Sequence, residues 1–191
     1  RTTVKSTQPG ISLHADLIGP ISEIGIQGER FIIVVKDEYS TYRQVACIKA
    51  KSDVPDATKV MITKSELETG NSVLRFCSDN GSEFVNERLR MFLAQKGIEH
   101  SKSAPYVPQQ NGTIERENRY LLDQARTLLN ATQLGKHLWP EAVKAATYVS
   151  NRSLTKNKSK TPFELWFGKR PNVDNLRIFG QHASVLKPEH Q

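Results

Sequence analysis

A run of five consecutive apolar residues, Phe31 to Val35, constrains the fold of this chain more than any other segment. Four of the five are β-branched, which favours a strand, and an unbroken apolar strand has to be covered on both faces. A chain with such a strand therefore places other elements on each side of one sheet. With 191 residues, of which 37% are hydrophobic, it is long enough to form one such domain.

Two further extended segments flank this run. Residues 11–18 alternate apolar and polar side chains, which is typical of a strand with one covered face. Residues 42–50 form a third extended segment after a turn around residues 37–41. Because short connections join the three segments, we predict three consecutive antiparallel strands.

The hydrophobic period changes in the middle of the chain. Residues 56–67 have helical spacing, with Val60, Met61 and Leu67 on the predicted apolar side. From there strands and helices alternate, which favours parallel pairing. The further predicted elements are a strand at 73–77, a helix at 86–96, a strand at 98–103, a loop at 104–110, and helices at 111–131 and 139–151.

This order predicts an α/β protein with a mixed five-stranded sheet, whose first three strands are antiparallel, flanked by helices. It is the element order of the ribonuclease H-like fold. Near the C-terminus, Thr161-Pro162 predicts the start of a short helix through Phe167. Residues 176–179 and 183–186 predict two short strands.

The positive charge is concentrated in the C-terminal half. Residues 1–108 contain 14 Lys and Arg against 13 Asp and Glu, whereas residues 109–191 contain 13 against 7. We predict a core domain at residues 1–152 and a basic extension at residues 153–191, packed on the core or following it. The formal net charge of +7 favours an acidic partner such as nucleic acid.

The composition disfavours several classes of protein. No apolar run approaches the length of a membrane-spanning helix, and the first residues lack the apolar segment of a signal peptide. Cys47 and Cys77 cannot form a zinc cage by themselves or a disulfide framework. We therefore expect no membrane partner, no zinc in this segment and a reducing intracellular compartment.

Three acidic residues stand out by their positions in the predicted fold. Asp16 lies on the polar face of the first strand, Asp79 at the end of the fourth strand, and Glu115 in the first turn of the long helix. The first and fourth strands are neighbours in this fold, so the three carboxylates would converge. Converging carboxylates attract divalent cations, and two such cations are suited to in-line attack on a phosphodiester.

Each acid also has a structural explanation. Asp16 could deter pairing at a sheet edge, Asp79 could serve only as a turn residue, and Glu115 could favour the helix N-terminus. Asp37 and Glu83 are alternative acids, and spacing alone does not exclude them.

The motifs around the acids are more specific than the acids themselves. Asp79 and Glu115 have 35 residues between them, and together with Asp16 they resemble the D,D(35)E triad of retroviral and retrotransposon integrases. The surrounding motifs are residues 14–20 (HADLIGP), 78–84 (SDNGSEF) and 105–116 (PYVPQQNGTIER). Segments similar to the Ty1/copia branch are 138–142 (LWPEA), 161–166 (TPFELW), 168–171 (GKRP) and 176–180 (LRIFG).

This resemblance implies a Ty1/copia-type LTR retrotransposon integrase catalytic core. Such a core inserts retrotransposon cDNA into chromosomal DNA by divalent-metal-dependent 3′-end processing and strand transfer. Asp16, Asp79 and Glu115 would be its catalytic residues and would hold Mg²⁺ or Mn²⁺ in a two-metal site. The resemblance also implies a homodimer or higher oligomer, which we expect to form through residues 86–96 and 139–151. It further implies nuclear location at integration and cytoplasmic virus-like particles beforehand.

Basic side chains near Glu115 are candidate DNA contacts. A helical projection places Arg119 and Arg126 on the flank of the long helix that carries Glu115, beside an apolar stripe that includes Asn118. Arg119 could instead form a surface ion pair with Glu115. The candidates for DNA contact are Asn111, Arg116, Arg119, Arg126, Lys156, Lys158 and Lys160.

Two other functions are compatible with these residues. Another two-metal nuclease of the ribonuclease H-like class would cut without joining, although the segment at residues 108–112 argues against it. A domesticated, non-catalytic DNA-binding domain would tolerate loss of the acids, but all three are intact.

Overall fold

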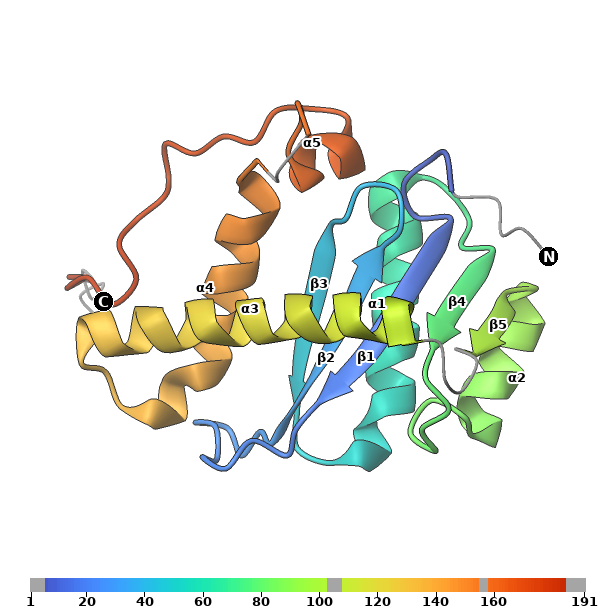
Figure 1. Ribbon diagram of the computed structural model, residues 1–191, viewed down its shortest axis with the longest axis horizontal. Helices are drawn as coiled ribbons and strands as arrows, with labels where there is room; N and C mark the ends of the chain where they lie inside the picture. The colour runs from blue at the N-terminus through green and yellow to red at the C-terminus, as the bar shows by residue number, and fades with distance from the viewer. Residues whose placement is uncertain (1–5, 103–107, 155–157, 185–191) are drawn as a thin grey trace, which may run out of the picture.

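The computed structural model describes residues 6–102, 108–154 and 158–184, and for residues 108–115 it describes only the helix backbone. Five strands form one sheet in the spatial order β3-β2-β1-β4-β5 (Figure 1). The first three strands pair antiparallel, while β4 and β5 run parallel to β1, as the sequence predicts. The strands are β1 (Ser12–Ile18), β2 (Phe31–Asp37), β3 (Arg43–Ile48), β4 (Arg75–Ser78) and β5 (Glu99–Lys102).

Helices cover both faces of the sheet. α1 and α2 pack on one face, and α3 and α4 cross the other (Figure 1). No helix in the described part of the chain is long and apolar enough to cross a membrane. The helices are η1 (Lys51–Asp53), α1 (Val54–Thr69), α2 (Glu87–Lys96), α3 (Pro108–Thr132), η2 (Lys136–Leu138), α4 (Trp139–Arg152) and α5 (Pro162–Phe167).

The apolar run in β2 explains this two-sided architecture. Ile33 and Val35 belong to the buried cluster beneath α1 and α2. Ile32 and Val34 belong to the buried cluster beneath α3 and α4. One strand therefore supplies two hydrophobic cores, and the prediction that it is covered on both faces is confirmed.

The buried face of α1 differs from the predicted one. Val60 and Leu67 are 67% and 81% exposed, so their assignment to the apolar side is wrong. Polar residues interrupt the true stripe, and Ser65 fits there because its hydroxyl donates to the Met61 carbonyl at 2.9 Å. A hydrophobicity pattern misses such positions. The buried residues of α1 are Val54, Pro55, Thr58, Met61, Ile62 and Ser65.

α3 begins earlier than the sequence predicts. The sequence pattern predicts a loop at 104–110 and a helix from residue 111, but the helix begins at Pro108. Proline is tolerated there because its missing N–H would have no partner within the helix. Glu115 consequently lies about two turns into the helix rather than in its first turn. The rest of the predicted loop, residues 104–107, lies outside the described residues.

The C-terminal segment confirms one prediction and corrects another. Thr161 caps α5, since its hydroxyl accepts from the Glu164 N–H at 3.1 Å and Glu164 accepts from the Thr161 N–H. Residues 176–179 are irregular and not a strand, and the Phe179 side chain packs against the α3–α4 cluster. Of the strand predicted at 183–186, residues 183 and 184 are irregular and the rest lie outside the described residues.

Trp166 joins α5 to the core beneath α1. Its ring stacks on Tyr42 at a centroid distance of 4.9 Å, and its indole N–H donates to Glu68 at 2.9 Å. Trp166 is only 2% exposed. Part of the basic extension thus shares the hydrophobic core, although the domain boundary at residue 152 remains a prediction.

Replacing this anchor should destabilise the whole domain. We expect Trp166→Ala to lower the free energy of unfolding by about 3–5 kcal/mol, since it removes a buried aromatic ring. Ile178→Ala is the control, because Ile178 is 78% exposed and its loss should have little effect. Urea unfolding of both variants measures the difference, and equal midpoints would contradict the anchoring role.

Candidate active site

The pairing of β1 with β4 brings Asp16 and Asp79 toward the same edge of the sheet. The two strands run parallel, with Leu13 beside Phe76 and His14 beside Cys77. Asp16 lies two residues beyond His14, and Asp79, the first residue after β4, lies two residues beyond Cys77. Neighbouring strands are about 4.8 Å apart where they pair. The convergence of the two acids, expected from the order of elements, is compatible with this register and stays a prediction.

Asp16 faces α3. Leu13 and Ala15 belong to the core beneath α1, so alternation directs Asp16 to the opposite face. There its Oδ2 accepts a hydrogen bond from the side-chain amide of Asn118, and its Oδ1 accepts from the Leu17 N–H at 2.9 Å. The Asn118 contact joins β1 to α3. The helical projection places Asn118 only in the apolar stripe of α3, and an amide within such a stripe is the signal for a polar partner on the sheet.

Glu115 is placed by the backbone of α3. It precedes Asn118 by three residues, so the two positions are neighbours on successive turns of the helix. Since Asn118 contacts Asp16, the turn that carries Glu115 adjoins Asp16. The side chain of Glu115 lies outside the described residues. Among the described side chains, no three His, Cys, Asp or Glu residues form a metal-binding group.

Asp79 lies in the exposed turn that follows β4. Its Oδ1 accepts from the Gly81 N–H at 3.0 Å, which is the turn contact considered from the sequence. The Ser78 hydroxyl donates to the Asp79 carbonyl at 2.9 Å. Both the backbone and the carboxylate of Asp79 are thereby held in place at the end of the strand.

The two alternative acids have partners of their own. Asp37 is 1% exposed and accepts hydrogen bonds from the Gly10 N–H, the Ser40 N–H and the Ser40 hydroxyl at 2.9, 2.7 and 2.6 Å, so it organises the turn between β2 and β3. Glu83 pairs with Lys51 at 3.3 Å. The Glu83 carboxylate also lies beside Gly81, close to the Asp79 carboxylate, so it borders the site.

The donor set at this site fits a hard divalent cation. Asp16 and Asp79 supply carboxylate oxygens, which Mg²⁺ and Mn²⁺ prefer. The cysteines do not form a thiolate pair, because Cys47 lies on β3 and Cys77 on β4, with β2 and β1 between these strands. Burial raises the pKa of the Cys47 thiol to about 12, which keeps it protonated.

An ion-pair cluster that the sequence analysis missed holds α3 on the sheet. Lys36 on β2 contacts the two carboxylate oxygens of Glu117 at 2.8 and 2.6 Å, and Arg43 on β3 contacts Glu117 at 3.0 Å. Partial burial raises the pKa of Glu117, but hydrogen bonds and charge from Lys36 and Arg43 outweigh it, so the net pKa is lowered. Because Glu117 follows Glu115 by two residues, these ion pairs hold α3 against the sheet close to Glu115.

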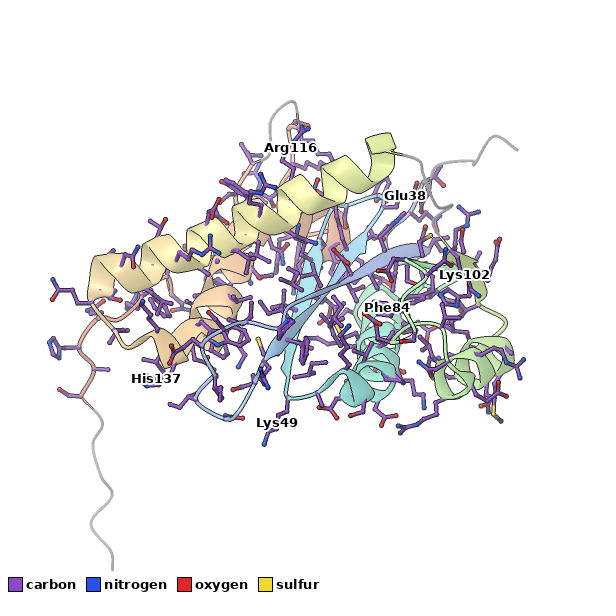
Figure 2. All side chains as sticks on the ribbon, turned by 60° about the horizontal axis from the view of Figure 1, so that its bottom comes forward. Glu38, Lys49, Phe84, Lys102, Arg116 and His137 are labelled. Atoms are coloured by element: carbon purple, nitrogen blue, oxygen red, sulfur yellow. The ribbon has the colours of Figure 1, made fainter. Side chains whose placement is uncertain are left out.

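The predicted DNA contacts occupy different environments. Arg116 and Arg119 are exposed on α3, and Figure 2 labels Arg116 there. Arg126 pairs with Asp123 at 2.9 Å, a partner that was not predicted. Lys158 donates to the Tyr39 carbonyl at 3.4 Å, and Lys160 is exposed. Two candidates have no described side chain: Asn111, within α3, and Lys156.

Comparison with known proteins identifies similar sequences. The integrase core domain family matches residues 6–108. The chain is 31% identical over 94% of its length to a retrovirus-related Pol polyprotein from transposon TNT 1-94 of Nicotiana tabacum. It is 33% identical over 94% to the Pol polyprotein of transposon RE2 from Arabidopsis thaliana, and 32% identical over 94% to the Ty1-DR4 Gag-Pol polyprotein of Saccharomyces cerevisiae. It spans only 14%, 12% and 11% of these relatives.

Solved structures share the fold at low sequence identity. One is the HTLV-2 integrase catalytic core domain in complex with magnesium, with a TM-score of 0.64 and 19% identity, covering 84% of this chain and 99% of that one. Another is a simian T-cell lymphotropic virus intasome in complex with PP2A regulatory subunit B56 gamma. Its TM-score is 0.69 at 16% identity, and the match covers 94% of this chain and 67% of that one. The ribonuclease H-like fold expected from the element order is thus confirmed.

The Glu117 cluster predicts a pH-dependent contribution to stability. Glu117→Gln should lower the free energy of unfolding at pH 7 by about 1–2 kcal/mol, because Lys36 and Arg43 lose a partly buried partner. Because folding lowers the pKa of Glu117, its contribution to stability is complete at pH values above the ordinary glutamate pKa of 4.5. The contribution is lost as the pH falls below that value and Glu117 becomes protonated. Urea unfolding at pH 7 and at lower pH measures it. Glu87→Gln, which affects the exposed pair with Arg90, is the control.

Proposed function

Because this chain belongs to the integrase core domain family, we propose that it is the catalytic core of a Ty1/copia-type retrotransposon integrase. Its reaction would insert element cDNA into chromosomal DNA by 3′-end processing followed by strand transfer. The observation that carries the proposal is the parallel pairing of β1 with β4, which directs Asp16 and the turn of Asp79 to one edge of the sheet, together with the contact of Asn118 on α3 with Asp16. The Pol polyproteins among its relatives support the retrotransposon assignment.

Asp16, Asp79 and Glu115 are the proposed catalytic residues and metal ligands. The Asn118 amide holds the Asp16 carboxylate toward α3, and the Gly81 N–H orients the Asp79 carboxylate within the turn that follows β4. When bound, two Mg²⁺ or Mn²⁺ ions would activate the attacking water or 3′-hydroxyl and stabilise the leaving oxygen. A magnesium complex of a structurally similar integrase core supports this choice of metal.

The exposed arginines of α3 are the proposed DNA contacts nearest the site. Arg116 and Arg119 follow Glu115 on the same helix and are open to solvent, so their guanidinium groups can reach phosphates. Arg126 is a weaker candidate because Asp123 already neutralises it. Lys158 and Lys160 belong to a second basic segment, which lies after α4 in the chain, and Asn111 and Lys156 remain candidates from the sequence.

Assembly and location follow from the same proposal. Insertion joins two cDNA ends to one target, which requires at least two active sites and hence a dimer or higher oligomer. An intasome among the structurally similar proteins supports this expectation. We further propose that the protein acts in the nucleus and that cytoplasmic virus-like particles carry it beforehand.

A disintegration assay tests the chemistry. A branched DNA that mimics the integration product is incubated with Mn²⁺ and the parent chain, Asp16→Asn, Asp79→Asn or Glu115→Gln. We expect each substitution to lower the rate by about a hundredfold or more, since each removes a ligand worth several kcal/mol of transition-state stabilisation. Glu87→Gln is the matched control, because this exposed acid on α2 pairs with Arg90.

The products of this assay distinguish the competing functions. Rejoining of the target strand supports a strand transferase, whereas cleavage without joining supports a ribonuclease H-like nuclease. DNA binding without any reaction supports a domesticated, non-catalytic domain. Activity that survives Asp79→Asn contradicts the assignment of the acids.

DNA binding should depend on Arg119. Because each phosphate contact releases about one counterion, Arg119→Gln should weaken binding and reduce the slope of log affinity against log salt by about one. Arg90→Gln is the control, since Arg90 lies on α2 and pairs with Glu87. Fluorescence anisotropy with a labelled duplex at several salt concentrations measures both slopes, and identical slopes would exclude Arg119 as a phosphate contact.

The oligomer interface proposed on α2 and α4 can be tested on α4. Ala145 lies on this helix near the exposed side chains of Tyr148 and Val149. Ala145→Glu would place a charge in an apolar interface and should convert a dimer into monomers. Sedimentation velocity measures the mass, and an unchanged distribution would place the interface elsewhere.

A further inference from the structure

A chain of hydrogen bonds leads from β5 to the Asp79 peptide. His100 Nε2 lies 2.9 Å from the Ser78 hydroxyl, and that hydroxyl donates to the Asp79 carbonyl at 2.9 Å. Ser78 is 2% exposed, so water does not compete for its hydroxyl. The three groups form one continuous path that ends on a proposed metal ligand.

The direction of these bonds follows from the number of protons. A serine hydroxyl has one proton, and Ser78 gives it to the Asp79 carbonyl. The hydroxyl oxygen must therefore accept from His100, which requires a proton on Nε2. A neutral imidazole with its proton on Nε2 meets this requirement, and so does the charged form, so the path does not depend on titration of His100.

His100 is itself held firmly. It is paired with Phe76 in the register of β4 and β5, and its ring lies 5.5 Å from the Phe76 ring, which belongs to the core beneath α1. β4 ends at Ser78, so strand pairing no longer constrains the residue that follows. The hydrogen bonds from His100 to Ser78 and from Ser78 to Asp79 therefore constrain the first residue after β4.

We propose that His100 is a positioning residue for the metal site, which fixes the Asp79 carbonyl through Ser78 and thereby sets the direction of the Asp79 carboxylate. The inference rests on the proposed function, since it takes Asp79 to be a metal ligand. The hydrogen bond from Gly81 to Oδ1 orients the carboxylate within the turn, and the path from His100 fixes the turn relative to β4. Without the hydrogen bonds from His100 through Ser78, Asp79 would still be present, but the direction of its carboxylate would vary more.

Two substitutions at His100 separate positioning from packing. His100→Phe keeps a ring against Phe76 but removes the N–H donor, whereas His100→Gln keeps an amide donor near the position of Nε2. Calorimetric titration with Mn²⁺ should show about threefold to tenfold weaker binding for His100→Phe, because one hydrogen bond of ordinary strength is lost. His100→Gln should bind within about twofold of the parent. Thermal unfolding without metal checks that each variant is folded.

A second measurement keeps the proposal testable if His100→Phe does not fold. Ser78→Ala removes the middle of the path, and its Mn²⁺ affinity should fall by the same factor. Where His100→Phe folds, combining it with Ser78→Ala should add no further loss, because both changes act on one path. Nitrogen-15 NMR of the imidazole in the parent should show the proton on Nε2.

The outcomes distinguish this inference from the proposed function. A parent chain that binds no Mn²⁺, or an Asp79→Asn variant that binds it as the parent does, overturns the proposed function and this inference with it. Mn²⁺ binding that needs Asp79 but is equal in His100→Phe, His100→Gln and the parent overturns the positioning role alone. Equal weakening in the two His100 variants overturns it as well, because the amide donor should rescue binding.

Discussion

Burial of β2 on both faces is the constraint on which the rest of the structure depends. Ile33 and Val35 require cover from α1 and α2, and Ile32 and Val34 require cover from α3 and α4. α3, which covers the second face, also passes over β1, the neighbour of β2 (Figure 1). α3 therefore brings Asn118 against Asp16, and the turn that carries Glu115 follows from the same packing. Hydrophobic burial, rather than attraction between catalytic groups, positions the site.

One acidic side chain on α3 engages two basic side chains of the sheet. Lys36 on β2 and Arg43 on β3 contact the same Glu117 carboxylate at 2.6 and 3.0 Å. Asp16 accepts hydrogen bonds from the Asn118 amide and from the Leu17 N–H, and these bonds orient its carboxylate. The Glu117 cluster thus serves two purposes, because it fixes α3 and keeps two basic side chains occupied.

Much of the fold could be predicted from the sequence, because its signals are local. The apolar run at β2, the alternation at β1, the capping pair Thr161 and Glu164, and the glycine that ends α2 each act within a few residues. The failures have physical reasons. The stripe of α1 contains buried Thr58 and Ser65, α3 starts at a proline, and the apolar Phe179 packs against the α3–α4 cluster without forming a strand.

By itself, the sequence determined which acids to examine, since Asp16, Asp79 and Glu115 lie within recognisable motifs at a recognisable spacing. It could not choose between Asp79 and Glu83, or show that Asp37 is engaged by Ser40 and Gly10. Nor could it reveal that Asn118 contacts Asp16 or that His100 reaches Ser78, because these contacts join residues 102 and 22 positions apart. Only tertiary structure decides such contacts, since they depend on how strands and helices pack and not on the residues beside them in the chain.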